Sequence, residues 1–253
     1  MVIQLFERWL ERWRRHREKG YEKRVNAYAK VIRKDNVHKQ ERKAAIDFFC
    51  MLEDSSIAVL HLLKRFDFSD ENSIVDSKEK EAALAGIISH GQDAIPIIKD
   101  YLHKTERIAW PLKALLKLAG EEEVVSALDA CLDLGKVDFD QSKVEKNFDV
   151  LCHFLDYEHI PNLANIAHFI DDRDERIRYA AVEIVTEKGG KEYLSKLEPY
   201  IFDELAENTR IRNVVLEAYV RHKWLIKDLD RISSLKIPGY SLSSKGLVTK
   251  VSG

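Results

Sequence analysis

Apolar residues recur every three or four positions along most of the chain, which is the spacing of one face of an α-helix. In the stretch 173–187, for example, Ile177, Ala181 and Ile184 fall on one stripe, and Gly189 follows where the pattern stops. No segment sustains the alternation of apolar and polar residues that a half-buried strand needs. Glycine and proline, which interrupt helices, number only 10 and 5 among 253 residues. The pattern predicts an all-α protein.

The predicted helices come in pairs. The first helix of each pair covers about 39–52, 77–90, 105–119, 142–155, 173–187 and, for a sixth, 208–222. The second helices align on Ile57, Ile95, Val124, Ile160 and Leu194, at intervals of 38, 29, 36 and 34 residues. Pairs at this period stack into α-solenoids, because each pair buries its apolar face only against its neighbours. We therefore predict an α-solenoid of about five to six helix pairs.

Several stretches of these repeats resemble a known family. DDRDERIRYAA (171–181) resembles the HEAT repeat at Asp172, Ile177, Arg178 and Ala181, and AIPII (94–98) fits it at Ala94, Ile95, Pro96 and Ile98. The form is the short bacterial one, related to phycobilin-lyase-type repeats. The chain is also similar to bacterial HEAT-repeat proteins in LLKRFDF (62–68), EKEAAL (79–84), WPLKAL (110–115) and PGYSLSSKGLV (238–248). The resemblance implies a right-handed superhelix and no particular activity.

Local chemistry adds expectations about helix ends. Asp76 with Glu79 fits a capping box at the start of a helix. Thr105 fits the cap of the next helix, which would place Pro111 about six residues inside it and predicts a kink there.

The repeats are expected to cover residues 37–236. Residues 1–36 would be basic amphipathic helices that cap the solenoid, and residues 237–253 a non-helical tail that forms a strand or drapes over the last helices. Helical phase places Tyr21, Val25, Tyr28 and Ile32 on one apolar stripe of the second N-terminal helix.

Charge is unevenly distributed along the chain. Residues 1–43 hold 14 Lys and Arg against 6 Asp and Glu, whereas residues 44–253 hold 27 against 37. The acidic body disfavours nucleic acid as a partner, because it repels phosphate.

The N-terminal segment is amphipathic. Its apolar face carries Phe6, Trp9 and Trp13, and Arg12, Arg14 and Arg15 lie on the polar face. We expect a capping helix that covers the end of the solenoid. The alternatives are a partner-docking helix, a membrane-surface helix and a nucleic-acid-binding arm.

Cysteine usage and hydropathy indicate the compartment. Cys50, Cys131 and Cys152 lie far apart and form no CxxC motif, which favours a reducing cytoplasm. No apolar run is long enough for a transmembrane segment, and the N-terminus lacks the apolar region of a secretory signal.

Neither a metal ion nor another cofactor is expected. The candidate ligands Cys152, His153, His159 and His168 match no familiar ligand spacing, and the two helices they span would splay them apart.

We interpret the chain as a non-catalytic scaffold that binds another protein or peptide, with a basic or mixed segment, on the concave face formed by its second helices. The residues expected to be exposed on or near that face are Lys64, Lys99, Tyr101, His103, His168 and Tyr200. Trp110 fits a core position or, alternatively, a contact in the groove. The resemblance further implies a ladder in which Arg178 and Arg212 pair with turn aspartates such as Asp172 and Asp174.

Catalysis remains an alternative, since HEAT-like folds include lyases and glycosylases. The acidic clusters of this chain sit at predicted helix starts, where capping and the helix dipole explain them. The sequence therefore favours a binding protein over an enzyme without naming the partner.

Overall fold

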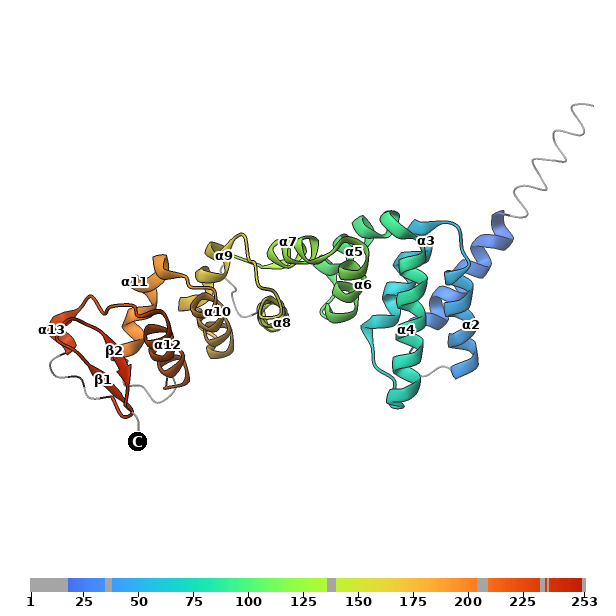
Figure 1. Cartoon of the computed structure of the whole chain (residues 1–253). Coiled ribbons are helices and arrows are strands. Elements are labelled where there is room, and N and C mark those ends of the chain that lie inside the picture. The colour runs from blue at the N-terminus through green and yellow to red at the C-terminus, as the bar shows by residue number, and fades with distance from the viewer. Residues whose placement is uncertain are drawn as a thin grey trace, which may run out of the picture. The chain divides into compact units, whose positions relative to one another are not determined.

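The protein is mostly helical in the computed structural model, which describes residues 18–34, 38–135, 140–203, 209–232, 235 and 237–251 (Figure 1). The prediction of an all-α protein is therefore confirmed, with a short hairpin as the addition. The chain divides into two units at Val124, a residue within helix α7 (Glu121–Cys131).

The first unit contains a helix over residues 18–32, followed by the first and second helices of the pairs. The first helices of its pairs are α2 (Lys39–Cys50), α4 (Ser73–Ser89) and α6 (Ala109–Ala119). The second helices are α3 (Ser55–Leu63) and α5 (Ala94–Lys104), with the 3-10 turns η1 (Lys64–Asp67) and η2 (Gly91–Asp93). Helix α4 contacts both α2 and α6, and α3 contacts α5. First helices therefore pack on first helices, and second helices on second helices.

The core of this unit follows the predicted stripes. Phe49, Leu62, Ile87 and Leu115 are fully buried, and on the helix over 18–32 Val25 and Ile32 are buried on the expected face. Gly86 permits close packing of α4 on α2, because a Cβ there would lie 2.4 Å from the Sγ of Cys50.

Two helix starts differ from the prediction. Helix α4 begins at Ser73, because the Asn72 side chain accepts a hydrogen bond from the Val75 amide and caps it. Asp76 therefore lies inside the helix and does not form a capping box. Helix α6 begins at Ala109 and not near Thr105, so Pro111 lies in its first turn, where a missing amide costs little and no kink is needed.

The second unit repeats the arrangement with shorter second helices. Its first helices are α8 (Gln141–Phe154), α10 (Glu175–Glu187) and α12 (Thr209–His222), and α10 packs against both others (Figure 1). The second-helix positions hold α9 (Leu163–Ala167) with η3 (His168–Asp171), and η4 (Lys191–Tyr193) with α11 (Leu194–Leu197) and η5 (Glu198–Phe202). Asp140 and Asp174 cap α8 and α10.

The C-terminal tail forms a hairpin after the short helix α13 (Leu229–Ile232). Strands β1 (Tyr240–Leu242) and β2 (Val248–Lys250) pair antiparallel, with Ser241 opposite Thr249. Strand β2 packs on α12, and Trp224 is buried against Tyr219 of that helix, so both cover α12, the last of the first helices. The predicted strand is therefore present. Among the described residues, no helix is both long and apolar enough to cross a bilayer.

Candidate functional site

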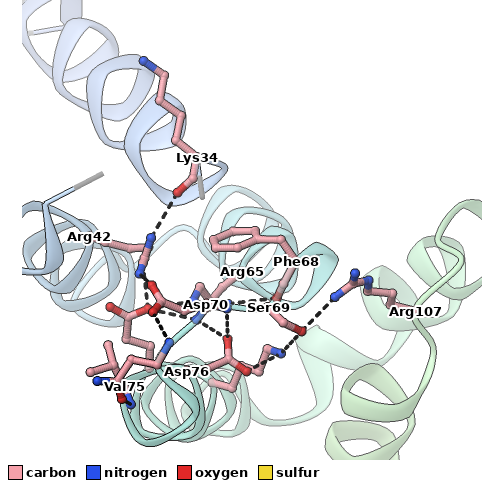
Figure 2. Close-up of polar contacts among 12 residues, drawn as sticks. Lys34, Arg42, Arg65, Phe68, Ser69, Asp70, Val75, Asp76 and Arg107 are labelled. Atoms are coloured by element: carbon pink, nitrogen blue, oxygen red, sulfur yellow. Dashed lines mark hydrogen bonds and ion pairs between the residues drawn. The ribbon is translucent and has the colours of Figure 1, made fainter. Parts of the chain in front are cut away.

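Among the described residues, six charged side chains converge in the first unit, between α2, η1 and α4 (Figure 2). We call this group the ion cluster. Its members are Arg42, Arg65, Asp70, Asp76, Glu79 and Lys80.

Glu79 lies at the centre of the ion cluster. Its Oε2 accepts hydrogen bonds from Nε of Arg42 at 2.7 Å and from Nε of Arg65 at 2.9 Å. Both guanidinium groups are fully buried, and Glu79 is only 7% exposed. One carboxylate on α4 therefore holds two cations that belong to the preceding helix pair.

The outer carboxylates complete the pairing. Asp70 accepts from Arg42, and Asp76 accepts from Nη2 of Arg65 at 2.7 Å and pairs with Nζ of Lys80 at 2.7 Å. Three cations thus face three carboxylates, so the buried charge is balanced. Because the charges are paired, burying the two arginines costs less free energy than burying unpaired charges would.

Phe68 covers the ion cluster. The Cζ of Arg65 lies 4.4 Å from the centroid of the Phe68 ring and that of Arg42 lies 5.4 Å away, within cation–π range. Arg65 also donates to the Phe68 carbonyl at 3.2 Å. The ring and the carbonyl shield the guanidinium groups from water.

Two further bonds connect the ion cluster to adjacent segments. Arg42 donates from Nη1 to the backbone carbonyl of Lys34 at 3.2 Å, which fastens the end of the N-terminal helix (Figure 2). Arg107, which precedes α6, donates at 3.0 Å to the hydroxyl of Ser69, which also accepts from Nζ of the cluster residue Lys80 at 3.4 Å. The cluster therefore links the segment before α2 to the segment before α6.

The ionisation of the cluster indicates a structural role. Burial alone would raise the pKa of Asp76, but hydrogen bonds from Lys80, the Asp70 amide and Arg65 more than offset it and bring the pKa to about 2. The pKa of Asp70 is also lowered, first by the Asn72 amide and then by Arg42. Neither carboxyl is poised to exchange protons near neutral pH, as a general acid or base would be.

Two of the residues expected on the binding face meet beside the ion cluster. Nζ of Lys64 lies 4.6 Å from the centroid of the Tyr101 ring and 3.6 Å from Asp67. The prediction that Tyr101 is exposed is wrong, since its side chain is 2% exposed and its hydroxyl donates to Asp67. A tyrosine can be buried where a neighbouring turn supplies an acceptor. Burial and the Asp67 charge raise its pKa.

The other candidates of the first unit keep some exposure. Lys99 is partly exposed and pairs with Glu123, and His103 is exposed on α5. Trp110 is half-buried, with its ring stacked on Phe66 at a centroid distance of 5.5 Å. That stacking agrees with the core position considered for Trp110.

In the second unit, His168 is exposed but Tyr200 is not. The expected exposure of Tyr200 is wrong because its hydroxyl donates to the buried carbonyl of Ile170 at 2.7 Å. Tyr200 borders a hollow of about 420 Å³ lined also by Asp171, Asp172, Arg178, Lys196, Pro199 and Asp203. Three sequence candidates, Asp172, Arg178 and Tyr200, therefore lie together.

Arg178, for which a ladder with turn aspartates was predicted, binds main-chain oxygens of the turn before α10. Its Nη1 donates to the backbone carbonyls of Asp172 at 2.9 Å and Arg173 at 2.8 Å. The Asp174 carboxylate instead caps α10 and binds Arg176. At Arg212, the buried Nε has no hydrogen-bond partner among the described residues, so a ladder at this position stays a prediction.

The predicted N-terminal residues Phe6, Trp9, Arg12, Trp13, Arg14 and Arg15 lie outside the described residues. Their roles stay predictions, as do the proposed domain boundaries.

The candidate metal ligands of the second unit do not come together in a metal site. Over the described part of the chain, no three His, Cys, Asp or Glu side chains gather closely enough to hold a metal ion. Burial, with smaller contributions from Asp149 and Glu183, raises the pKa of Cys152. That thiol is therefore mostly protonated at neutral pH and is a poor nucleophile.

A second buried carboxylate organises the C-terminal end. Glu198 is 8% exposed and accepts from the backbone amides of Lys227 at 3.1 Å and Asp228 at 3.0 Å. It also accepts from the Tyr219 hydroxyl at 3.3 Å. Glu198 thereby fixes the chain segment that leads from α12 to the hairpin.

The sequence did contain a signal for the buried arginines that we missed. Arg42 is in phase with Ala45, Ile46 and Phe49, the buried stripe of α2. An arginine in an apolar stripe must find a carboxylate, because a lone buried charge is very costly.

Comparisons with family models, with curated proteins and with solved structures give no match. The site is therefore interpreted from its own geometry.

Proposed function

We propose that this chain is a non-catalytic protein-interaction scaffold built of HEAT-like helix pairs. In this proposal the pairs form an α-solenoid, and its second helices present the surface that binds a partner protein or peptide. The proposed partner segment is basic or mixed in charge, since residues 44–253 carry an excess of acid.

The observation that carries the repeat architecture is the sequence separation of its polar contacts. In the first unit, Tyr101 binds Asp67 across 34 residues, and His90 binds Ser55 across 35. In the second unit, Lys188 binds the Tyr157 carbonyl across 31 residues. Further bonds span 29 to 38 residues, among them Arg42–Glu79, Arg107–Ser69, Asn165–Asp129, Lys196–Ala167 and Arg221–Glu187.

These separations match the repeat intervals of the sequence, which lie between 29 and 38 residues. Equivalent turns of successive helix pairs are therefore joined to one another within each unit. Contacts restricted to neighbouring repeats are the defining property of solenoid proteins.

Two features support binding over catalysis. The ionised groups of the ion cluster are paired and buried, which suits a structural role. In addition, Lys99, His103 and His168 offer exposed polar groups on the second helices or the turns that follow them.

Site-specific photo-crosslinking tests the proposed face. A photoreactive residue at position 99, 103 or 168 should capture one protein from a lysate of the source cells. The matched controls are positions 78 and 117, exposed on the first helices α4 and α6. Alanine at the position that captures the partner should then weaken binding of that partner to the purified chain. Equal capture from the control positions, or none from any position, would contradict the proposal.

A further inference from the structure

The exposed face of the N-terminal helix carries a row of like charges. Lys19, Lys23 and Lys30 fall within a narrow arc, directly opposite the buried Val25 and Ile32, and all three are exposed. We call these three residues the basic stripe. Asn26 lies in the same arc and Ala27 beside it, so the arc itself contains no carboxylate, and Glu22, three residues after Lys19, borders it.

Several lysines elsewhere on the helices pair with a carboxylate. Lys104 pairs with Asp100 at 2.5 Å, Lys143 with Asp133 at 3.1 Å and Lys80 with Asp76 at 2.7 Å. Within the described residues, none of the three stripe lysines forms an ion pair, and the same holds for Lys78, Lys113 and Lys117 on α4 and α6, so the stripe differs from them in its like charges on one arc. Lys19 and Lys23 are four residues apart, a spacing at which like charges repel and destabilise a helix. A single-sign face of this kind is stabilised by a partner of opposite charge.

Further positive charge adjoins the end of this helix. Arg33 directly follows the helix and is exposed. Burial, and then the charges of Arg33 and Lys64, lower the pKa of His61 on α3. Lys64 also lies over the ring of Tyr101 on α5. Arg33 therefore adds positive charge at the C-terminal end of the basic stripe.

We propose that the basic stripe is the docking site for an acidic segment of a partner protein. Lys19 and Lys30 are 11 positions apart, which is about 17 Å along the helix. An extended peptide of about five residues covers that length, so a short run of Asp and Glu suffices.

Other polyanions fit this face less well. Its arc holds no aromatic or large aliphatic side chain to insert into a bilayer or to stack on bases, since Tyr21 and Tyr28 lie toward the fold and Tyr28 stacks on Phe48. A long nucleic acid would also extend from this short stripe onto the acidic remainder of the chain. A short acidic peptide meets neither obstacle.

The test is titration of the full chain into a dye-labelled poly-L-glutamate peptide, read by fluorescence anisotropy. The triple variant K19Q/K23Q/K30Q removes the stripe, and glutamine keeps a high helix propensity. The control K78Q/K113Q/K117Q removes the same charge from exposed positions of α4 and α6 in the same unit. Residues 1–17 are identical in both variants, so their own charges affect both equally.

We expect the stripe variant to bind at least about tenfold more weakly and the control to change less than about twofold. The intact chain should also lose affinity as salt rises, since exposed charges are screened. Equal weakening in both variants, or none in the stripe variant, would overturn the proposal. So would tighter, stripe-dependent binding to duplex DNA or to phosphatidylserine vesicles. The proposed function concerns the second helices and is tested there by crosslinking, so either proposal can fail alone.

Discussion

The two units connect neighbouring helix pairs at the same repeat interval but with different polar chemistry. In the first unit, Arg42 and Arg65 are fully buried around Glu79. In the second, Arg176 binds Glu145 with side chains 45% and 49% exposed. A buried pair is costly to break because it leaves an unpaired charge, whereas water replaces an exposed pair at little cost. The two units should therefore respond very differently when one carboxylate is removed.

Glu79→Ala should produce the largest effect. It leaves two buried guanidinium groups short of their central carboxylate, and we expect a loss of about 3–5 kcal/mol in the stability of the first unit. Hydrogen exchange resolved by peptide reports each unit separately, so faster exchange should be confined to residues 18–124. Unchanged exchange in α2 and α4 would contradict a stabilising role for the cluster.

Glu198→Ala tests the buried carboxylate of the second unit. Removing the acceptor leaves the Lys227 and Asp228 amides unpaired, which should cost about 1–3 kcal/mol. Exchange should rise in the hairpin and α13 more than in α8. A uniform rise over the whole unit would show that Glu198 does not act locally on the C-terminal segment.

Acid should weaken the first unit through Asp76. Its pKa falls from an ordinary 3.8 to about 2 on folding, so its stabilising effect is complete above about pH 5 and is lost as pH falls toward 2. Asp76→Asn should abolish that dependence, and the stability difference between the parent and the variant should shrink as pH decreases. A constant difference from pH 6 to pH 2 would show that Asp76 is not the titrating group.

Glu145→Gln should have the smallest effect. Its partner Arg176 keeps bonds to the Asp174 carboxylate, and both side chains of the lost pair are well exposed. We expect urea unfolding of this variant to be indistinguishable from that of the parent. A loss comparable with that of Glu79→Ala would remove the contrast between the two units.

Helix positions were predictable because each apolar stripe is a local pattern. Helix α10 (Glu175–Glu187) was expected over 173–187, and α12 (Thr209–His222) over 208–222. The start of α6 was misplaced because Thr105 resembles a cap, whereas it follows α5 and accepts from the Arg107 amide. The preference of proline for a first turn favoured the correct start.

The ion cluster was not predicted because its pairing is non-local. Asp76 and Glu79 fit a capping motif within four residues, yet the Arg42 that binds Glu79 lies 37 positions away. The prediction that Tyr101 is exposed was wrong for the same reason, since its acceptor Asp67 belongs to the preceding helix pair. Helical phase shows which residues share a face, but not which polar group a neighbouring repeat offers to that face.

The bond between Arg42 and the N-terminal helix ends on a main-chain oxygen of Lys34. Every amino acid supplies that oxygen, so the joint does not depend on the side chain at position 34. Substitutions can therefore change the charges of the exposed helix face, and with them the partner that it binds, without removing the bond that attaches the helix.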